Sequence, residues 1–254
     1  MKRAAADSAV GAQALGPSYA QWRSSRLGRI TDRLEETLMF ELLEPLTGKT
    51  LLDVGCGDAA MAAACARKGA AVIGLDSDPA MIAAARRRAA KFGGEAFALV
   101  EGKAENLPFN DGSFDIVFAV TVLCFVRDPG PAIAEMNRVL KPGGRLVIGE
   151  LGRWSLWAAH RRIRGWLGHP VWRAAVFRGP AALRRAAETA GLVVIAMRGA
   201  AYYPPCGIAA QLLAPLDAWA GRSTTFGAAF LAMSSVKPLC DEGRRPPARF
   251  GRPA

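Results

Sequence analysis

Apolar residues recur along this chain with two different periods, and the changes of period mark its predicted elements. Between residues 19 and 46, Ile30, Leu34, Leu38 and Leu42 follow one another at intervals of four, which predicts an amphipathic helix. Short apolar runs then alternate with Ala-rich stretches of helical length. The runs predict strands at 50–54, 71–76, 96–102, 114–120 and 145–150, and the stretches between them predict helices at 59–69, 79–92 and 132–140.

The regular alternation predicts βαβ units, and therefore an α/β fold whose sheet is parallel with right-handed crossovers. After Glu150 the alternation stops, and residues 153–178 form an insert rich in Trp and Arg. Beyond this insert the pattern predicts helices at 180–191 and 206–219 and strands at 192–197 and 226–236.

The two ends of the chain lack such patterning. Residues 1–16 and 237–254 are small, polar or Pro- and Arg-rich, so both segments are expected to be disordered. What remains is one predicted domain over residues 17–236, with its α/β core at about residues 50–150.

Composition narrows the class of protein. The chain has 254 residues, of which 51% are hydrophobic and 22% charged, so it can form a core. Its lack of a long uninterrupted apolar stretch excludes a transmembrane helix, and the polar start of the chain does not resemble a signal peptide. A cytoplasmic location is the expectation. The five cysteines include no CxxC pair, which argues against a disulfide framework and predicts no metal site.

The net charge of +11 lies in one part of the chain. Residues 151–254 carry 15 Lys or Arg and 4 Asp or Glu, whereas the preceding residues are balanced. Such asymmetry indicates either an anionic partner or a bias in amino-acid usage.

The most informative segment is the glycine turn at the end of the first predicted strand. Asp53 is followed by Gly55 and Gly57, and Asp76 ends the second strand, where a carboxylate can accept hydrogen bonds from ribose hydroxyls. This spacing also fits the loose dinucleotide pattern. Asp53 distinguishes a dinucleotide from S-adenosylmethionine as the ligand. A carboxylate at this position would repel the pyrophosphate of a dinucleotide but attract a cationic amino group, such as that of S-adenosylmethionine.

Four ordered segments of the chain resemble the class I S-adenosylmethionine-dependent methyltransferases, in particular the small-molecule methyltransferases grouped with ubiquinone/menaquinone C-methyltransferases. These segments are LLDVGCGDA (51–59), VIGLDSDPAMIAAAR (72–86), GKAENLPFNDGSFDIVFAV (102–120) and AIAEMNRVLKPGGRLVIGE (132–150). The resemblance implies a Rossmann-like fold with a mostly parallel, seven-stranded sheet. It also implies that the last strand is antiparallel and lies beside the fifth.

The resemblance also implies which residues contact S-adenosylmethionine. Lys103 stands where relatives commonly carry Asp or Asn, so recognition of adenine would fall to the backbone amide of Ala104. The implied contacts are Asp53, Gly55 and Gly57 to the methionine part, Asp76 and Ser77 to the ribose, Lys103, Ala104 and Glu105 to the adenine, and Val120 at the end of the fourth strand.

Methyl transfer from a sulfonium is a direct displacement, so the protein mainly aligns the reacting groups, and a base is needed only when the acceptor must lose a proton. No compact group of bases stands out, and catalytic residues are not assigned. The small-molecule acceptor, apolar or anionic, would bind outside the shared core. The candidate residues are Tyr19 and Trp22 before the first helix pattern and Trp154 and Trp157 in the insert.

The insert predicts a helix with Leu156, Ala159, Ile163 and Leu167 on one apolar face and Trp157 opposite. Three interpretations stay open. Its tryptophans pack under neighbouring loops, or the helix forms a lid over the acceptor, or it lies in a membrane interface as a peripheral contact.

Other functions fit parts of the sequence. The basic C-terminal part suits an RNA methyltransferase, but Val120-Thr121-Val122-Leu123 stands where a catalytic Asn/Asp-Pro-Pro-aromatic motif would lie, which argues against nucleic acid. Asp53 disfavours a nicotinamide-dependent oxidoreductase. A non-catalytic partner subunit with the same fold is a further alternative, and the oligomeric state is not predicted.

Overall fold

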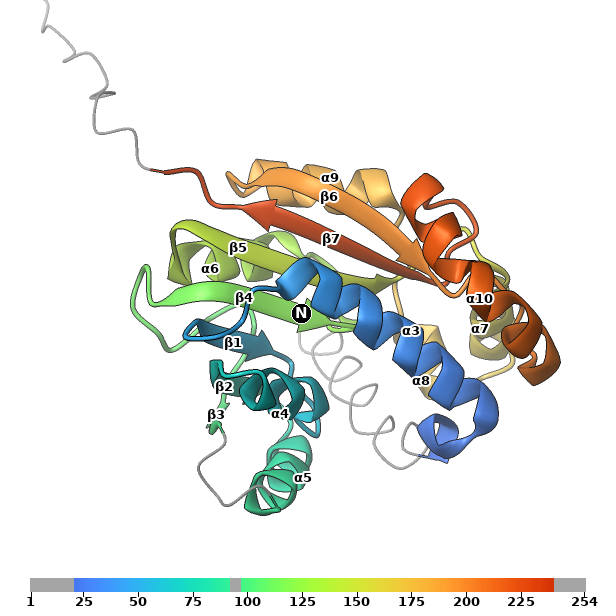
Figure 1. The fold of residues 1–254 in the computed structure, drawn as a ribbon, viewed down its shortest axis with the longest axis horizontal. Helices are drawn as coiled ribbons and strands as arrows, with labels where there is room; N and C mark the ends of the chain where they lie inside the picture. Colours follow the sequence, from blue (N-terminus) through green and yellow to red (C-terminus); the bar gives the residue numbers. More distant parts are fainter. Residues whose placement is uncertain (1–20, 92–96, 240–254) are drawn as a thin grey trace, which may run out of the picture.

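A mixed seven-stranded sheet forms the centre of the computed structural model, which describes residues 21–91 and 97–239. The strand order is β3-β2-β1-β4-β5-β7-β6, and β7 runs antiparallel to both of its neighbours while the other pairs are parallel (Figure 1). The predicted fold class is confirmed, including the antiparallel last strand beside the fifth. The strands are β1 (Thr50–Val54), β2 (Ala71–Asp76), β3 (Ala98–Glu101), β4 (Phe114–Val120), β5 (Leu140–Leu151), β6 (Val193–Ala200) and β7 (Phe230–Val236).

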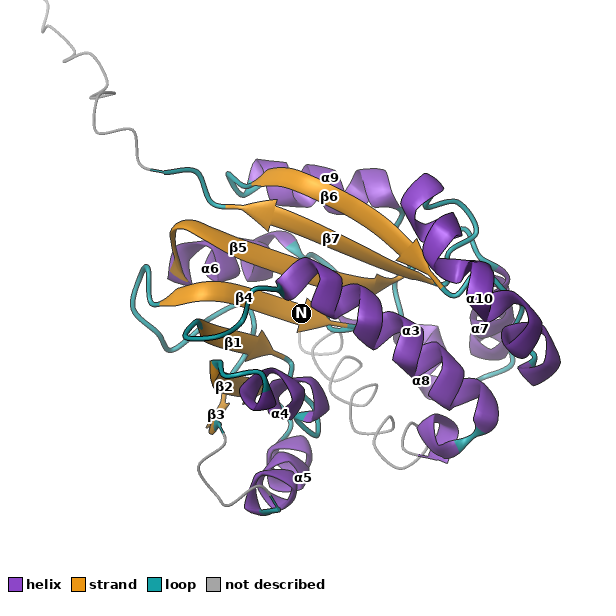
Figure 2. Cartoon of the chain, in the orientation of Figure 1, coloured by secondary structure: helices purple, strands orange, loops and turns teal. Residues whose placement is uncertain are grey.

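Helices cover both faces of the sheet and gather at one end of it (Figure 2). Helices α3, α4 and α5 pack on one face, α6 and α9 on the other, and α7, α8 and α10 lie near the carboxyl ends of the parallel strands. Their bounds are α3 (Arg26–Leu43), α4 (Ala60–Arg67), α5 (Pro79–Ala90), η1 (Leu123–Phe125), α6 (Gly130–Val139), α7 (Leu156–Trp166), α8 (Pro170–Ala174), α9 (Pro180–Thr189) and α10 (Gly207–Ser223). Within the described ranges, no helix is long and apolar enough to cross a membrane.

Side-chain caps fix where several helices begin. The hydroxyl of Ser25 accepts a hydrogen bond from the Gly28 amide at the start of α3, and Ser155 caps α7 in the same way. Asp78 caps α5, and Pro79 follows at the first helical position, where its missing amide costs nothing.

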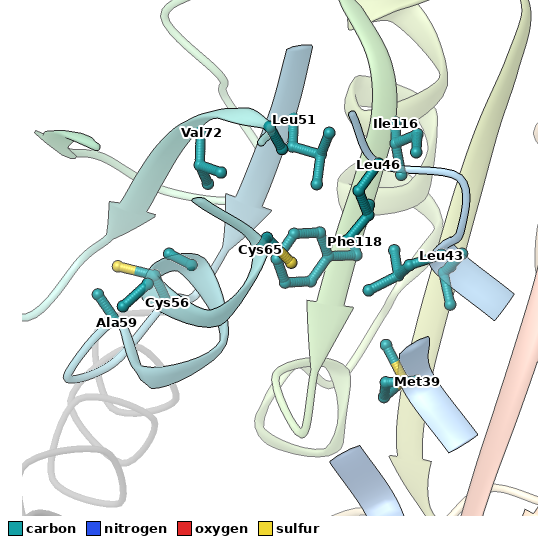
Figure 3. Packing of buried hydrophobic residues seen from close by; sticks show 14 of the residues in the cluster. Met39, Leu43, Leu46, Leu51, Cys56, Ala59, Cys65, Val72, Ile116 and Phe118 are labelled. Atoms are coloured by element: carbon teal, nitrogen blue, oxygen red, sulfur yellow. The ribbon is translucent and has the colours of Figure 1, made fainter. Parts of the chain in front are cut away.

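The core lies on both faces of the sheet. On the face shown in Figure 3, Met39 and Leu43 of α3 pack with Cys65 of α4 against Phe118 of β4. On the other face, apolar residues of α6 and α9 cover the opposite side chains of the central strands. Each large side chain buried in this way stabilises the fold by about 1.5–3 kcal/mol, so the central strands form a rigid base for the loops at their ends.

The predicted start of the fifth strand differs from the structure. The strand begins at Leu140, before the predicted residue 145, because Leu140 pairs with Phe114 and an irregular segment then separates that pair from Ile116 and Arg145. Gly143 in this segment has a φ of +76°, which glycine adopts without strain.

The predicted disordered tail begins too early in the sequence. Lys237 is held in place, since its ammonium group donates to the carbonyls of Asn137 and Leu140 at 2.8 Å each, and its amide donates to the Gly144 carbonyl. The prediction is therefore wrong at this residue. The rest of that prediction over 240–254, and the one over 1–16, lie outside the described residues.

Candidate functional site

The turn between β1 and α4 is tied to the end of β2. The amides of Gly55 and Cys56 both donate to the Leu75 carbonyl, at 2.6 and 2.9 Å. Gly55 has a φ of +72°, and a Cβ added there would lie 2.3 Å from a methyl group of Val122. Glycine is therefore required at this position for its backbone angle and for the close approach of the β4–η1 segment.

Asp76, the last residue of β2, closes the same turn with its side chain. One carboxylate oxygen accepts from the Gly57 amide at 2.8 Å and the other accepts from the Asp78 amide at 2.9 Å. Burial raises the pKa of Asp76, and the hydrogen bonds from Asp78 and Gly57 oppose that rise. Each oxygen keeps a lone pair for a further donor, so the carboxylate can position the turn and still bind a hydroxyl.

Asp53 lies at the floor of the site and is only 3% exposed. Burial holds the pKa of Asp53 well above its usual range, and the negative charge of Asp76 adds to the effect. A cationic group on a ligand would stabilise the ionised carboxylate. At Gly57 no atom lies within 4 Å of where a Cβ would stand, so the turn is open to a ligand.

One cavity of about 2280 Å³ runs from this turn to α3, η1, α7 and α8. Its volume exceeds the roughly 300–1,000 Å³ usual for one small-molecule site, so it has room for two ligands. All of the residues predicted to contact S-adenosylmethionine line it, and their role in binding stays a prediction. They are Asp53, Gly55, Gly57, Asp76, Ser77, Lys103, Ala104, Glu105 and Val120.

The far end of the cavity is built from aromatic rings and a buried cation. The guanidinium of Arg161 lies 5.0 Å from the ring centroids of both Trp157 and Trp172. Trp157 in turn meets Trp22 edge to face, with the centroids 6.2 Å apart. These contacts join α7, α8 and the segment before α3 into one wall, held by cation–π and edge-to-face attraction.

The predicted apolar face of α7 points outward. Leu156, Ile163 and Leu167 are 63%, 50% and 81% exposed. The helix buries the opposite side, which includes Trp157 and Arg161. The reason is local. A Cβ on Gly165 would lie 2.9 Å from the Trp172 carbonyl oxygen, so the glycine side of the helix is the one that fits against α8.

The predicted acceptor residues separate into three groups. Trp22 and Trp157 line the cavity. Trp154 does not, because it lies outside the cavity wall, 57% exposed, under the guanidinium of Arg153. The structure does not group it with the other candidates, and its role in acceptor binding stays a prediction. Tyr19 lies outside the described residues.

Three titratable residues of the cavity wall were not assigned from the sequence: Glu35, His160 and His169. Burial raises the pKa of Glu35 to about 7, while Arg161 opposes the rise. Burial and the charge of Arg164 lower the pKa of His169, whose Nδ1 is buried without a hydrogen-bond partner. Glu35 lies one helical turn before the buried Met39, but no pattern along the helix indicates that its carboxyl group is removed from water.

Metal binding has no support in this part of the structure. Among residues 21–91 and 97–239, no three His, Cys, Asp or Glu side chains are grouped to hold an ion.

Residues 52–148 match the methyltransferase domain family. A demethylmenaquinone methyltransferase of Tropheryma whipplei is 41% identical over 110 residues, which are 43% of this chain and 45% of that protein. An uncharacterized protein of Mycobacterium bovis is 33% identical over 235 residues, covering 92% of this chain and 75% of that one.

Among solved structures, a SAM-dependent methyltransferase of Thermotoga maritima, titled a possible histamine N-methyltransferase, shares the fold. Its TM-score is 0.66 at 22% identity, covering 87% of this chain and 94% of that one. The matches to the first curated relatives span only about a third to a half of those proteins, between 34% and 48%.

The two glycines of the β1–α4 turn predict different costs of substitution. Gly55→Ala should lower the free energy of unfolding by about 2–5 kcal/mol, because the new Cβ meets Val122 and the backbone is left-handed. Gly57→Ala meets no atom and should cost only about 1–2 kcal/mol. Urea titrations of both variants measure the difference, and equal losses would contradict the steric role of Gly55.

A second prediction concerns Glu35. Because its pKa is raised in the folded state, the contribution of Glu35 to stability is fully present below about pH 4.5, the ordinary pKa of glutamate, and is lost as the pH rises through about 7. Glu35→Gln has no carboxyl group to ionise at this position, so it does not lose stability in this way as the pH rises. Between about pH 5 and pH 8.5 the variant should therefore gain about 1–2 kcal/mol over the wild type, a figure reduced because the side chain still contacts water in the cavity. Parallel pH profiles of the two proteins would disprove the shift.

Proposed function

The chain belongs to the class I S-adenosylmethionine-dependent methyltransferases, and from this premise we propose that it transfers a methyl group from S-adenosylmethionine to a small-molecule acceptor. The observation that carries the proposal is the single cavity, which joins the acidic glycine turn at one end to the aromatic and cationic wall at the other.

The residues at the glycine turn fit the donor. Bound S-adenosylmethionine supplies a methyl group on a positively charged sulfur, which needs no further activation. Asp53 would face the cationic methionine part, which would relieve the unfavourable ionisation of its buried carboxylate. Asp76 would accept hydrogen bonds from the ribose while it holds the Gly57 amide. The exposed Lys103 lines the same cavity, and the Ala104 amide would serve the adenine.

The other end of the cavity suits an acceptor with a flat apolar part. Trp22, Trp157 and Trp172 offer ring surface, and Arg161 and Arg164 add positive charge to the wall that also holds Glu35. These residues would hold the acceptor in line with the donor, and alignment of two bound reactants can supply about 7–11 kcal/mol of the barrier. An acceptor that is apolar, anionic or both matches this wall.

Glu35 is our candidate for receiving a proton from an acceptor that must lose one. A base acts best when its pKa lies near the working pH, and the pKa of Glu35 is raised to about 7 in the wall of the cavity. His169 offers a neutral imidazole nitrogen at the same end.

Calorimetry with S-adenosylmethionine and its demethylated product tests the donor assignment. Both should bind with Kd values in the micromolar range, about −8 kcal/mol, and NADH should not compete. Asp76→Asn should weaken binding by about 1.5–3 kcal/mol because a charge-assisted hydrogen bond is lost. Asp111→Asn, an exposed carboxylate outside the cavity, is the matched control. Transfer of a radiolabelled methyl group to a panel of phenolic, quinol and carboxylic acceptors then tests the reaction. NADH binding in place of the sulfonium donor would overturn the proposal.

Proton release on donor binding tests the role of Asp53 separately. Burial raises the pKa of Asp53 and a cationic ligand lowers it, so a proton should leave on binding in the pH range between the two pKa values, which titrations at several pH values locate. The binding enthalpy should therefore differ between phosphate and Tris buffers, whose ionisation enthalpies differ. Asp53→Asn should abolish the difference. Equal enthalpies for the wild type in both buffers would contradict the assignment.

A further inference from the structure

Helix α10 exposes its large apolar residues to solvent, whereas a helix that covers a core normally buries them. Ile208, Leu212, Leu216 and Trp219 follow one another along one side, and their exposed fractions are 70%, 71%, 60% and 73%. The buried residues of the helix are small or polar: Ala210, Asp217 and Gly221. A helix of a water-exposed surface normally shows the opposite arrangement.

Specific contacts fix this orientation of α10. The Asp217 carboxylate accepts hydrogen bonds from the amides of Ala201 and Tyr202, at 3.0 and 2.9 Å. A Cβ on Gly221 would lie 2.2 Å from the Gly199 carbonyl oxygen, so no larger side chain fits there. The polar and glycine side must therefore face β6, and the leucines must face away from it.

Helix α7 is oriented in the same way. Its exposed residues include Trp166 and Leu167, at 83% and 81%, whereas Trp157 and Arg161 face the cavity. Two neighbouring helices thus both present their large apolar side chains to the outside.

The two exposed faces belong to one end of the molecule. Trp157 of α7 and Ala210 of α10 share one buried cluster, and the amide of Gly227 donates to the Trp154 carbonyl at 3.0 Å. Figure 1 shows α7 and α10 at the same end of the sheet. We call these exposed residues the apolar end: Trp154, Leu156, Ile163, Trp166, Leu167, Ile208, Leu212, Leu213, Leu216, Trp219 and Phe226.

The charges around the apolar end are positive. Helices α7 and α10 carry Arg162 and Arg222 at least partly exposed and outside the cavity wall, and the one acidic residue of helices α7, α8 and α10, Asp217, is buried. A second copy of the chain placed face to face would bring like charges together. A surface that is both apolar and anionic complements this end.

We propose that the apolar end docks on membranes that contain anionic lipids. Tryptophan and leucine side chains of α7 and α10 enter the boundary between headgroups and acyl chains, and the arginines contact lipid phosphates. Exposed apolar patches of this extent mark interaction sites, and the mixture of Trp, Leu and Arg is typical of helices that lie in a membrane interface. The docking does not depend on the proposed methyl transfer.

Co-sedimentation of the full chain with vesicles tests the proposal. The wild type should sediment with vesicles of phosphatidylglycerol and phosphatidylcholine, and much less with phosphatidylcholine alone. Leu212→Ser/Leu216→Ser/Trp219→Ser should weaken binding by about tenfold or more. The matched control is Val193→Ser/Ile195→Ser, which removes side chains that are 56% and 57% exposed at the start of β6. It should bind as the wild type does.

Trp166→Ser/Leu167→Ser on α7 gives a second, independent variant, and it should also lose vesicle binding. Binding of S-adenosylhomocysteine by each variant checks that the fold is intact and reports on the donor site separately. The proposal is overturned if the wild type does not sediment with anionic vesicles, or if both apolar variants sediment as well as the control. A dimer in light scattering that the α10 variant abolishes, without vesicle binding, would instead assign the apolar end to a second copy.

Discussion

Two parallel strands that end side by side, β1 and β2, are the constraint on which the candidate site depends. Their pairing from Thr50 to Val54 places the turn after β1 directly beside Asp76. The hydrogen bond from the Gly57 amide to Asp76 then fixes the turn, so its glycines cannot move independently of the carboxylate. Asp76 shapes the turn and can still accept a hydrogen bond from a ligand hydroxyl, so ligand binding and the geometry of the turn depend on the same side chain. Substitution of Asp76 therefore affects the turn and the ligand contact together.

The strands could be predicted because their signal is local. The bounds predicted for runs such as 71–76 and 114–120 match the observed strands, since a strand covered on both faces is apolar at nearly every position. The glycine-turn end of the cavity followed from the same strands, because carboxyl ends of neighbouring parallel strands meet at one edge of the sheet. The resemblance to a known family added the number of strands and the antiparallel last strand beside the fifth.

The acceptor end could not be predicted in the same way, because its geometry depends on contacts between distant segments. The apolar periodicity of 156–167 indicates which side of the helix is hydrophobic, but Gly165 and the contacts of Arg161 with two tryptophan rings decide which side is buried. Glu35 was equally hidden. Its environment comes from burial under α7 and the nearby Arg161, which no pattern along α3 reveals.

Helix α7 contributes to both the cavity and the apolar end. This explains why it buries Trp157 and Arg161 and exposes its aliphatic residues, unlike most surface helices. Its inward side must supply Trp157 and Arg161 to the wall, so it cannot also provide an aliphatic stripe for packing. The aliphatic residues that remain face outward beside those of α10. Left in water, each would forgo about 1.5–3 kcal/mol of burial, which favours any surface that covers them. A contact on the outer side of α7 would therefore bear directly on the position of the residues that line the acceptor end.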